Sequence, residues 1–193
     1  MPDTYLPTSP QSRFQLLKFF SHLLLATTIS ILLLSACSQN TRDAETVGNS
    51  LPASEFEIEL FGNENHQSGE ILRLADLKGK AVIINFWYPS CPPCREEIPY
   101  FESAYQQYKN LGVEFIGVQN LGLDTIQDGQ LFIDEYAVTY AVGADATGEI
   151  VVDYKIIGFP STVFLDRNHH IVRHWTGGLD LEKLVSLVQT TLE

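Results

Sequence analysis

The chain has 193 residues, of which 45% are hydrophobic, so it can bury the core of one ordinary domain. Its formal net charge of -12 disfavours nucleic-acid binding, because nucleic-acid-binding proteins need clustered Lys and Arg to displace counterions from phosphate. The sequence contains no segment rich in Lys and Arg, and we therefore expect no nucleic-acid partner.

The N-terminal region has the pattern of an export signal. Arg13 and Lys18 precede a largely apolar segment, residues 19–36, and small residues then lead to Cys37. The motif LSAC at this point resembles the lipobox of bacterial lipoproteins, in which the signal is cut before a cysteine that carries a diacylglycerol. We expect an extracytoplasmic protein anchored by lipid on Cys37. An uncleaved signal anchor, which about 18 mostly apolar residues marginally allow, and cleavage without lipid remain alternatives.

The composition divides the chain into a lipoprotein-type signal peptide (1–36), a flexible tether (37–54) and a folded domain (55–193). The tether is assigned because residues 38–54 are polar and show no apolar periodicity.

The first half of the domain predicts a strand, helix, strand order. Residues 55–61 alternate as a strand does, and the apolar, β-branched run 81–87 favours a central buried strand. Residues 92–108 have helical spacing of apolar positions, and 113–119 predict a second buried strand. This order implies a parallel pair of strands with a right-handed crossover.

The second half predicts two helices, a hairpin and a final helix. The helices are expected within 125–136 and over 148–154, and an antiparallel hairpin over 161–166 and 170–175. Asp180 can cap the final helix, in which apolar residues form one stripe.

The three cysteines are Cys37, Cys91 and Cys94, and an odd number in an exported protein calls for an explanation. If Cys37 holds lipid, Cys91 and Cys94 remain as a pair. Two cysteines separated by two residues are better explained as a cycling dithiol than as a structural staple, because a staple gains stability from closing a longer loop.

The position of the pair indicates how the two thiols divide the chemistry. Cys91 lies at the start of the predicted helix, where free backbone N–H groups favour the thiolate, and we expect its sulfur to be exposed to attack. Pro92 and Pro93 fit the first turn, where their missing donors are not needed. Cys94, one turn further on, can displace a partner from the mixed disulfide on Cys91.

Two motifs, GKAVIINFWYPSCPPCREEIP (79–99) and IIGFPSTVFLDRNHHIV (156–172), resemble the thioredoxin superfamily. They are most similar to the membrane-anchored TlpA/ResA-type thiol-disulfide oxidoreductases, which include reductants of cytochrome c maturation. The resemblance implies an α/β fold of three layers, in which helices flank a central mixed sheet and a β-hairpin extends the N-terminus. It also implies electron exchange with protein disulfides, more as a reductant than as an oxidant, with no cofactor besides the redox-active Cys91–Cys94 disulfide.

The resemblance assigns further site residues. Pro160 would be cis and lie against the dithiol, and Phe159 before it would offer backbone hydrogen bonds to an extended partner. An ordinary trans proline at the start of an edge strand is the alternative. Trp87, Pro92 and Pro93 would lie at the substrate-binding surface, with most of Trp87 in the core.

Two positions bear on proton transfer. Asn85 stands where many cytoplasmic thioredoxins have a buried aspartate, so that general base is missing. Glu97 matches an acidic position of the ResA-type proteins and could serve as the base if it is partly buried. Its alternative role is that of a first-turn acid favoured by the helix dipole.

The expected partners are proteins with a disulfide or dithiol, for example apocytochrome c, together with a membrane thiol donor and the lipid bilayer. We expect a monomer. Two alternatives are a non-catalytic Cu(I)-binding chaperone or docking module, and a thiol peroxidase, although such peroxidases carry Thr where this chain has Tyr88. We expect no metal site, since a second Cys pair is missing and His169, His170 and His174 fit a solvated turn.

Overall fold

The computed structural model describes residues 51–192, and all residue-level statements below concern that part of the chain. The predicted signal peptide and Cys37 lie outside the described residues. Within them, no helix combines the length and the apolar character needed to cross a membrane.

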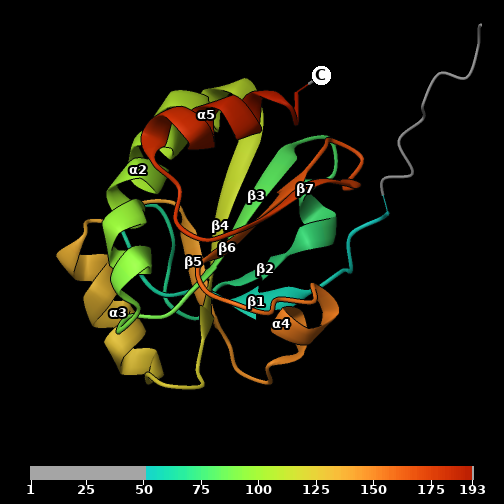
Figure 1. Ribbon diagram of the computed structural model, residues 1–193. Coiled ribbons are helices and arrows are strands. Elements are labelled where there is room, and N and C mark those ends of the chain that lie inside the picture. Colours follow the sequence, from blue (N-terminus) through green and yellow to red (C-terminus); the bar gives the residue numbers. More distant parts are fainter. Residues whose placement is uncertain (1–50, 193) are drawn as a thin grey trace, which may run out of the picture. The chain divides into compact units, whose positions relative to one another are not determined.

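A five-stranded mixed sheet forms the centre of the domain, in the order β5-β4-β3-β6-β7 (Figure 1). The strands β3, β4 and β5 run parallel, whereas β6 is antiparallel to β3, and β7 is antiparallel to β6. The bounds are β3 Ala81–Trp87, β4 Val113–Asn120, β5 Ala141–Asp145, β6 Ser161–Leu165 and β7 Ile171–Thr176. The predicted central strand, parallel pair and hairpin are all confirmed.

A small two-stranded hairpin precedes the sheet, as the resemblance implied. It consists of β1 (Glu57–Glu59) and β2 (Ile71–Arg73), which pair antiparallel. A bridge between Leu60 and Gly143 attaches it to β5 at the edge of the main sheet.

Four α-helices and two short 3-10 helices complete the domain. Their bounds are α2 Pro92–Tyr108, α3 Ile126–Glu135, α4 Glu149–Asp153, α5 Leu181–Gln189, η2 Leu74–Leu77 and η3 Lys109–Leu111. The carboxylate of Asp180 accepts a hydrogen bond from the backbone N–H of Lys183, so the predicted cap of the final helix is confirmed.

The alternation of β3 side chains separates two hydrophobic cores. Ile83 and Trp87 belong to a cluster with residues of α2, α3 and α5. Val82, Ile84 and Phe86 belong to a second cluster with residues of the hairpin and α4. Because successive strand residues point to opposite faces, one strand anchors helices on one side and the hairpin with α4 on the other. This is the predicted three-layer arrangement (Figure 1).

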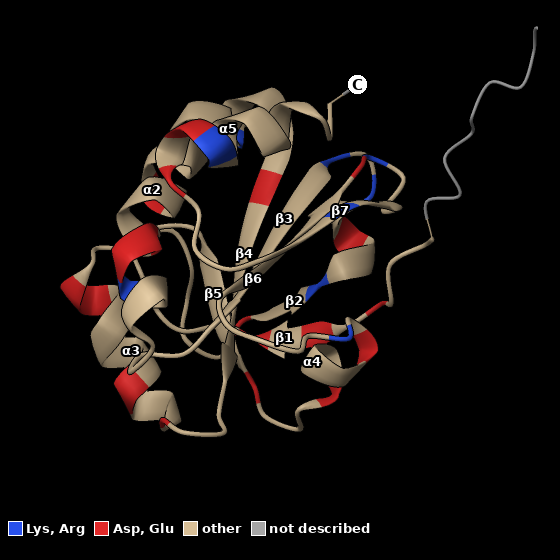
Figure 2. Cartoon of the chain, viewed as in Figure 1, with Lys and Arg blue, Asp and Glu red and all other residues tan. Residues whose placement is uncertain are grey.

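The charged residues of the described domain are mostly acidic on the helices. Figure 2 shows acidic segments on α2, α3 and α4, whereas Lys and Arg lie scattered in small groups. Among these residues there is no basic stripe of the kind that tracks a nucleic-acid backbone.

The folded domain begins earlier than the predicted Glu55. The amide of Ile171 donates to the carbonyl of Leu51 at 2.8 Å, and the amide of Ala53 donates to the carbonyl of His169 at 2.9 Å. Residues 51–54 therefore belong to the domain rather than to the tether. The sequence did not reveal this, because backbone hydrogen bonds require no apolar side chains.

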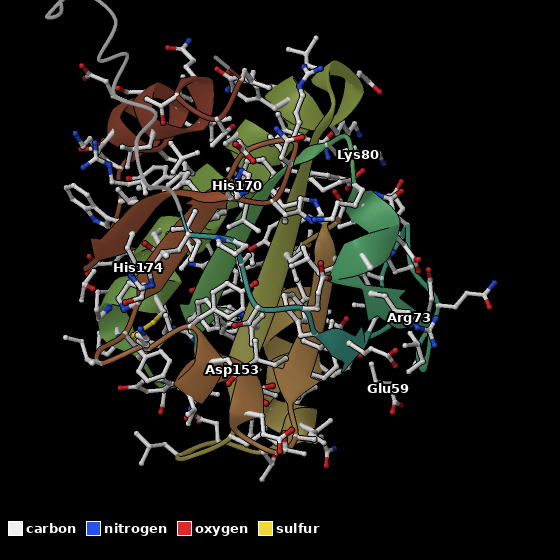
Figure 3. All side chains as sticks on the ribbon, turned by 90° about the vertical axis from the view of Figure 1, so that its right-hand side faces the viewer. Glu59, Arg73, Lys80, Asp153, His170 and His174 are labelled. Carbon is white, nitrogen blue, oxygen red and sulfur yellow. A yellow bond between two sulfur atoms is a disulfide. The ribbon has the colours of Figure 1, made fainter. Side chains whose placement is uncertain are left out.

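The prediction of a solvated histidine turn is wrong for His169, which is only 1% exposed. Its turn between β6 and β7 is held by Ala53, from the start of the domain, which local sequence patterns cannot indicate. His174 lies on β7, exposed, with its Nε2 3.0 Å from the carbonyl oxygen of Tyr154 (Figure 3). Among residues 51–192 there is no group of three His, Cys, Asp or Glu residues that could hold a metal ion.

Replacement of Gly143 by alanine is expected to destabilise the domain by about 1–3 kcal/mol. A Cβ at this position would overlap the carbonyl oxygen of Glu59 and lie 2.7 Å from Cγ1 of Ile58, so the hairpin would have to move. Urea unfolding followed by circular dichroism measures the effect. The matched control is Gly158→Ala, whose Cβ would meet only an ordinary contact at 3.5 Å. Equal stability of the two variants would show that the hairpin tolerates the shift.

Candidate active site

A disulfide joins Cys91 and Cys94 at the start of α2, as predicted (yellow in Figure 3). Their Cα atoms are 5.2 Å apart. Cys91 is the N-cap of the helix, and its Sγ accepts a hydrogen bond from the backbone N–H of Cys94 at 3.3 Å. Pro92 and Pro93 occupy the first helical turn, where no backbone donor is missed. The geometry therefore brings both sulfurs to the positive end of the helix dipole.

The expected exposure of the Cys91 sulfur is not found in this oxidised state. Cys91 is 1% exposed and Cys94 is fully buried, whereas Pro92 and Pro93 between them are exposed. The sequence pattern places a residue at a helix end but does not show which loops pack over it. A partner thiolate can reach Cys91 only if the surrounding side chains move.

Glu97 lies one turn after Cys94 on α2, and its side chain is buried. The side-chain amide of Asn85 donates to Oε1 of Glu97 at 2.8 Å, and the backbone N–H of Leu179 donates to Oε2 at 2.9 Å. Burial raises the pKa of Glu97 from 4.5 to about 7, although the two hydrogen bonds oppose this shift. Of the two roles that the sequence left open, the first-turn acid is not found, because α2 begins at Pro92 and Glu97 lies in its second turn. The role of Glu97 as a base stays a prediction.

Asn85 connects β3 and β6 to this carboxyl group. It is fully buried on β3, and its Nδ2 lies 2.8 Å from Glu97 and 3.3 Å from Oγ1 of Thr162 on β6. Asn85 is neutral at every accessible pH, so Glu97 is the titratable member of this buried group. A buried carboxyl with a pKa near 7 can take or give a proton at neutral pH.

The peptide bond between Phe159 and Pro160 is cis, in agreement with the resemblance. The ring of Phe159 packs edge-to-face against Tyr88, with 5.5 Å between the ring centroids. The loop before β6 thus contacts the segment that leads from β3 to Cys91. The contact of Pro160 with the dithiol and the backbone contacts of Phe159 with a partner stay predictions.

A family model described as AhpC/TSA matches residues 47–174. The chain belongs to the AhpC/TSA family. It is 38% identical over 138 residues to the thiol-disulfide oxidoreductase ResA of Oceanobacillus iheyensis, and this match covers 72% of the chain and 69% of that protein. The similarity to ResA, together with the disulfide at the start of α2, identifies this family member as a thioredoxin-like thiol-disulfide oxidoreductase.

Solved structures support the same fold. StoA from Bacillus subtilis superposes with a TM-score of 0.60 at 26% identity, covering 72% of this chain and 98% of that chain. A thiol:disulfide interchange protein of the thioredoxin family from Chlorobium tepidum has a TM-score of 0.64 at 24% identity, covering 75% and 97%. At this identity the second match shows the fold alone.

Trp87 lies in the core of this family member. Its ring is 1% exposed and stacks on Phe132 of α3 with 4.6 Å between the centroids. The core-packing role that the sequence favoured is therefore confirmed. In this state the indole offers almost no surface to a partner, and its part in substrate binding stays a prediction.

Two contacts beside the disulfide were missed by sequence reasoning. The carboxylate of Asp124 accepts hydrogen bonds from both the backbone N–H and the hydroxyl of Ser90. Arg95 pairs with Glu135 of α3 at 2.9 Å. Each contact joins residues more than thirty positions apart in the chain, and no motif in the sequence signals either of them.

Proposed function

We propose that this protein is an extracytoplasmic reductant, anchored by lipid on Cys37, that passes two electrons from Cys91 and Cys94 to a disulfide in another protein. The observation that carries the proposal is the Cys91–Cys94 disulfide at the helix N-terminus with Glu97 buried one turn beyond it. The names of the relatives at 38% and 34% identity support thiol-disulfide exchange as the reaction. Apocytochrome c as substrate and a membrane thiol carrier as electron donor follow from the ResA-type resemblance.

The reaction takes place in two exchange steps. In the first, the Cys91 thiolate attacks one sulfur of the substrate disulfide, and the other substrate sulfur leaves as a thiolate that takes a proton from water. In the second, the Cys94 thiol gives its proton to Glu97, and the resulting thiolate attacks the Cys91 sulfur. The Cys91–Cys94 disulfide forms and the second substrate thiolate leaves. The enzyme dithiol is thereby oxidised and the substrate disulfide reduced.

The proposal predicts that a Cys94→Ser variant accumulates a mixed disulfide with its substrate through Cys91. Without the resolving sulfur, the second exchange step cannot take place, so the covalent adduct persists. The full chain is expressed with the variant, free thiols are blocked in acid, and adducts are identified by mass spectrometry with and without reductant. Captured partners are expected to be exported proteins with cysteine pairs.

The matched control is Cys91→Ser, which removes the attacking sulfur and is expected to capture almost nothing. If Cys91→Ser traps partners and Cys94→Ser does not, the two roles are reversed. A third outcome would support the chaperone alternative instead. In that case neither variant traps a protein, the wild type has no disulfide exchange activity, and the purified wild type binds one Cu(I) ion per chain. Capture of cytoplasmic proteins alone in intact cells would contradict the proposed location.

A further inference from the structure

The carboxylate of Asp124 lies at the N-terminal end of α2, the end at which Cys91 is located. It lies in the loop between β4 and α3, and its Oδ2 is 2.8 Å from the hydroxyl oxygen of Ser90 and 3.2 Å from the backbone nitrogen of Ser90. Ser90 directly precedes Cys91, the N-cap of the helix. The negative charge is thus bonded to the turn that presents Cys91.

The loop that carries Asp124 is held in place by its own contacts. Thr125 caps α3 in a reciprocal capping box with Asp128, and the side-chain amide of Gln119 donates to the carbonyl of Thr125 at 2.9 Å. Because Ser90 donates twice and the backbone of the following residue is fixed, the Asp124 carboxylate moves away from this turn only by breaking both hydrogen bonds to Ser90.

Other charged groups also lie near this end of α2. Arg95 pairs with Glu135 of α3 and donates to the carbonyl of Pro89 at 3.3 Å, so a cation lies on the same turn as Asp124. Asp128 lines the same hollow and bonds to Thr125, and Glu96 is exposed. Glu97 lies buried one turn after Cys94, where it bonds to Asn85 and Leu179. Asp124 is the carboxylate that bonds directly to the residue before Cys91.

We propose that Asp124 makes the Cys91–Cys94 couple more reducing by opposing the thiolate of Cys91. This inference rests on the proposed function as a reductant. The helix N-terminus stabilises a thiolate, and a fixed negative charge beside it acts in the opposite direction. A less stable thiolate makes the reduced protein less stable relative to the disulfide, so electrons are passed on more readily.

The test is an Asp124→Asn variant of the full chain. Its amide oxygen can still accept from Ser90, but the charge is gone. The equilibrium of the protein disulfide and two glutathione thiols with the protein dithiol and glutathione disulfide is expected to shift about fivefold toward the dithiol. This corresponds to a reduction potential of the Cys91–Cys94 couple that is about 20 mV less negative than in the wild type. Alkylation of Cys91 by iodoacetamide, followed on its peptide by mass spectrometry, should reach half its maximal rate at a lower pH.

Two controls separate charge from packing. Ser90→Ala removes one hydrogen bond but keeps the charge, and its equilibrium constant is expected to stay within about twofold of wild type. Asp134→Asn removes the same charge from the other end of α3, where Asp134 bonds to Gln130, and should leave the equilibrium unchanged.

If Asp124→Asn and the wild type have the same equilibrium constant and alkylation profile, the proposal is wrong even though the exchange activity stands. A shift of equal size in Ser90→Ala would assign the effect to the hydrogen bond instead of the charge. Asp124→Ser, also neutral, provides the same measurement if Asp124→Asn does not fold. A wild type without any exchange activity would instead refute the proposed function.

Discussion

Replacing Glu97 with glutamine is expected to slow closure of the Cys91–Cys94 disulfide about 100-fold at neutral pH. The carboxyl group is buried, is held by Asn85 and Leu179, and has its pKa raised to about 7 by burial. It is therefore half in its basic form near neutral pH and can accept the Cys94 proton. Glutamine keeps the size and one acceptor oxygen but cannot take a proton.

The measurement is a single turnover of reduced protein with a disulfide peptide, stopped with acid and analysed by mass spectrometry. The wild-type rate of the second step should rise as the pH passes about 7, because only the ionised Glu97 accepts a proton. In Glu97→Gln this rise should be absent. Glu96→Gln, at the exposed neighbouring position, is the control. A Glu97→Gln variant that closes its disulfide at the wild-type rate would remove Glu97 from the mechanism.

Glu97 is also expected to make the oxidised protein less stable as the pH rises. Between pH 4.5 and about 7, the unfolded chain has released the Glu97 proton while the folded protein still holds it. Unfolding then releases a proton, so the free energy of unfolding falls with rising pH. Above pH 7 the free energy of unfolding has fallen by about 3 kcal/mol in total. This value follows from the difference between the Glu97 pKa of 4.5 in the unfolded chain and about 7 in the folded protein.

Urea unfolding of the disulfide-intact wild type and Glu97→Gln at several pH values tests this. The difference in unfolding free energy, variant minus wild type, should increase by about 3 kcal/mol between pH 4 and pH 8. The subtraction removes the contributions of all other titrating groups. Glu96→Gln, at the exposed neighbouring position, is measured in parallel as a control. A difference for Glu97→Gln that stays constant with pH would mean that the Glu97 carboxyl titrates normally in the folded protein.

The sequence predicted best those elements whose signals are local. Helix α2 was placed at Pro92–Tyr108, because the apolar spacing, the two prolines and the capping cysteine all lie within the helix itself. Strand β3 was recognised from its continuous apolar run, because it is buried on both faces.

The features that the sequence left open or missed share a different cause, which is contact between distant segments. Buried Glu97 is hydrogen-bonded by Asn85 and by Leu179, which lies 82 residues later in the chain. The burial of His169 accompanies backbone pairing with the Leu51–Ala53 segment, and the Ser90–Asp124 contact joins two loops. A single sequence does not show which distant residues contact each other. The chemistry of these side chains could therefore suggest a role, but their burial and their partners could not be predicted.

The point at which the chain enters the domain has a consequence for access to the sulfurs. The backbone of Leu51 accepts a hydrogen bond from the amide of Ile171, at the end of the sheet where Leu165 pairs with Val82. The disulfide follows Trp87 at the other end of β3. The entry point of the chain and the redox centre therefore lie at opposite ends of the central strand, so the segment that enters at Leu51 leaves the surface around Pro92 and Pro93 open to a partner protein.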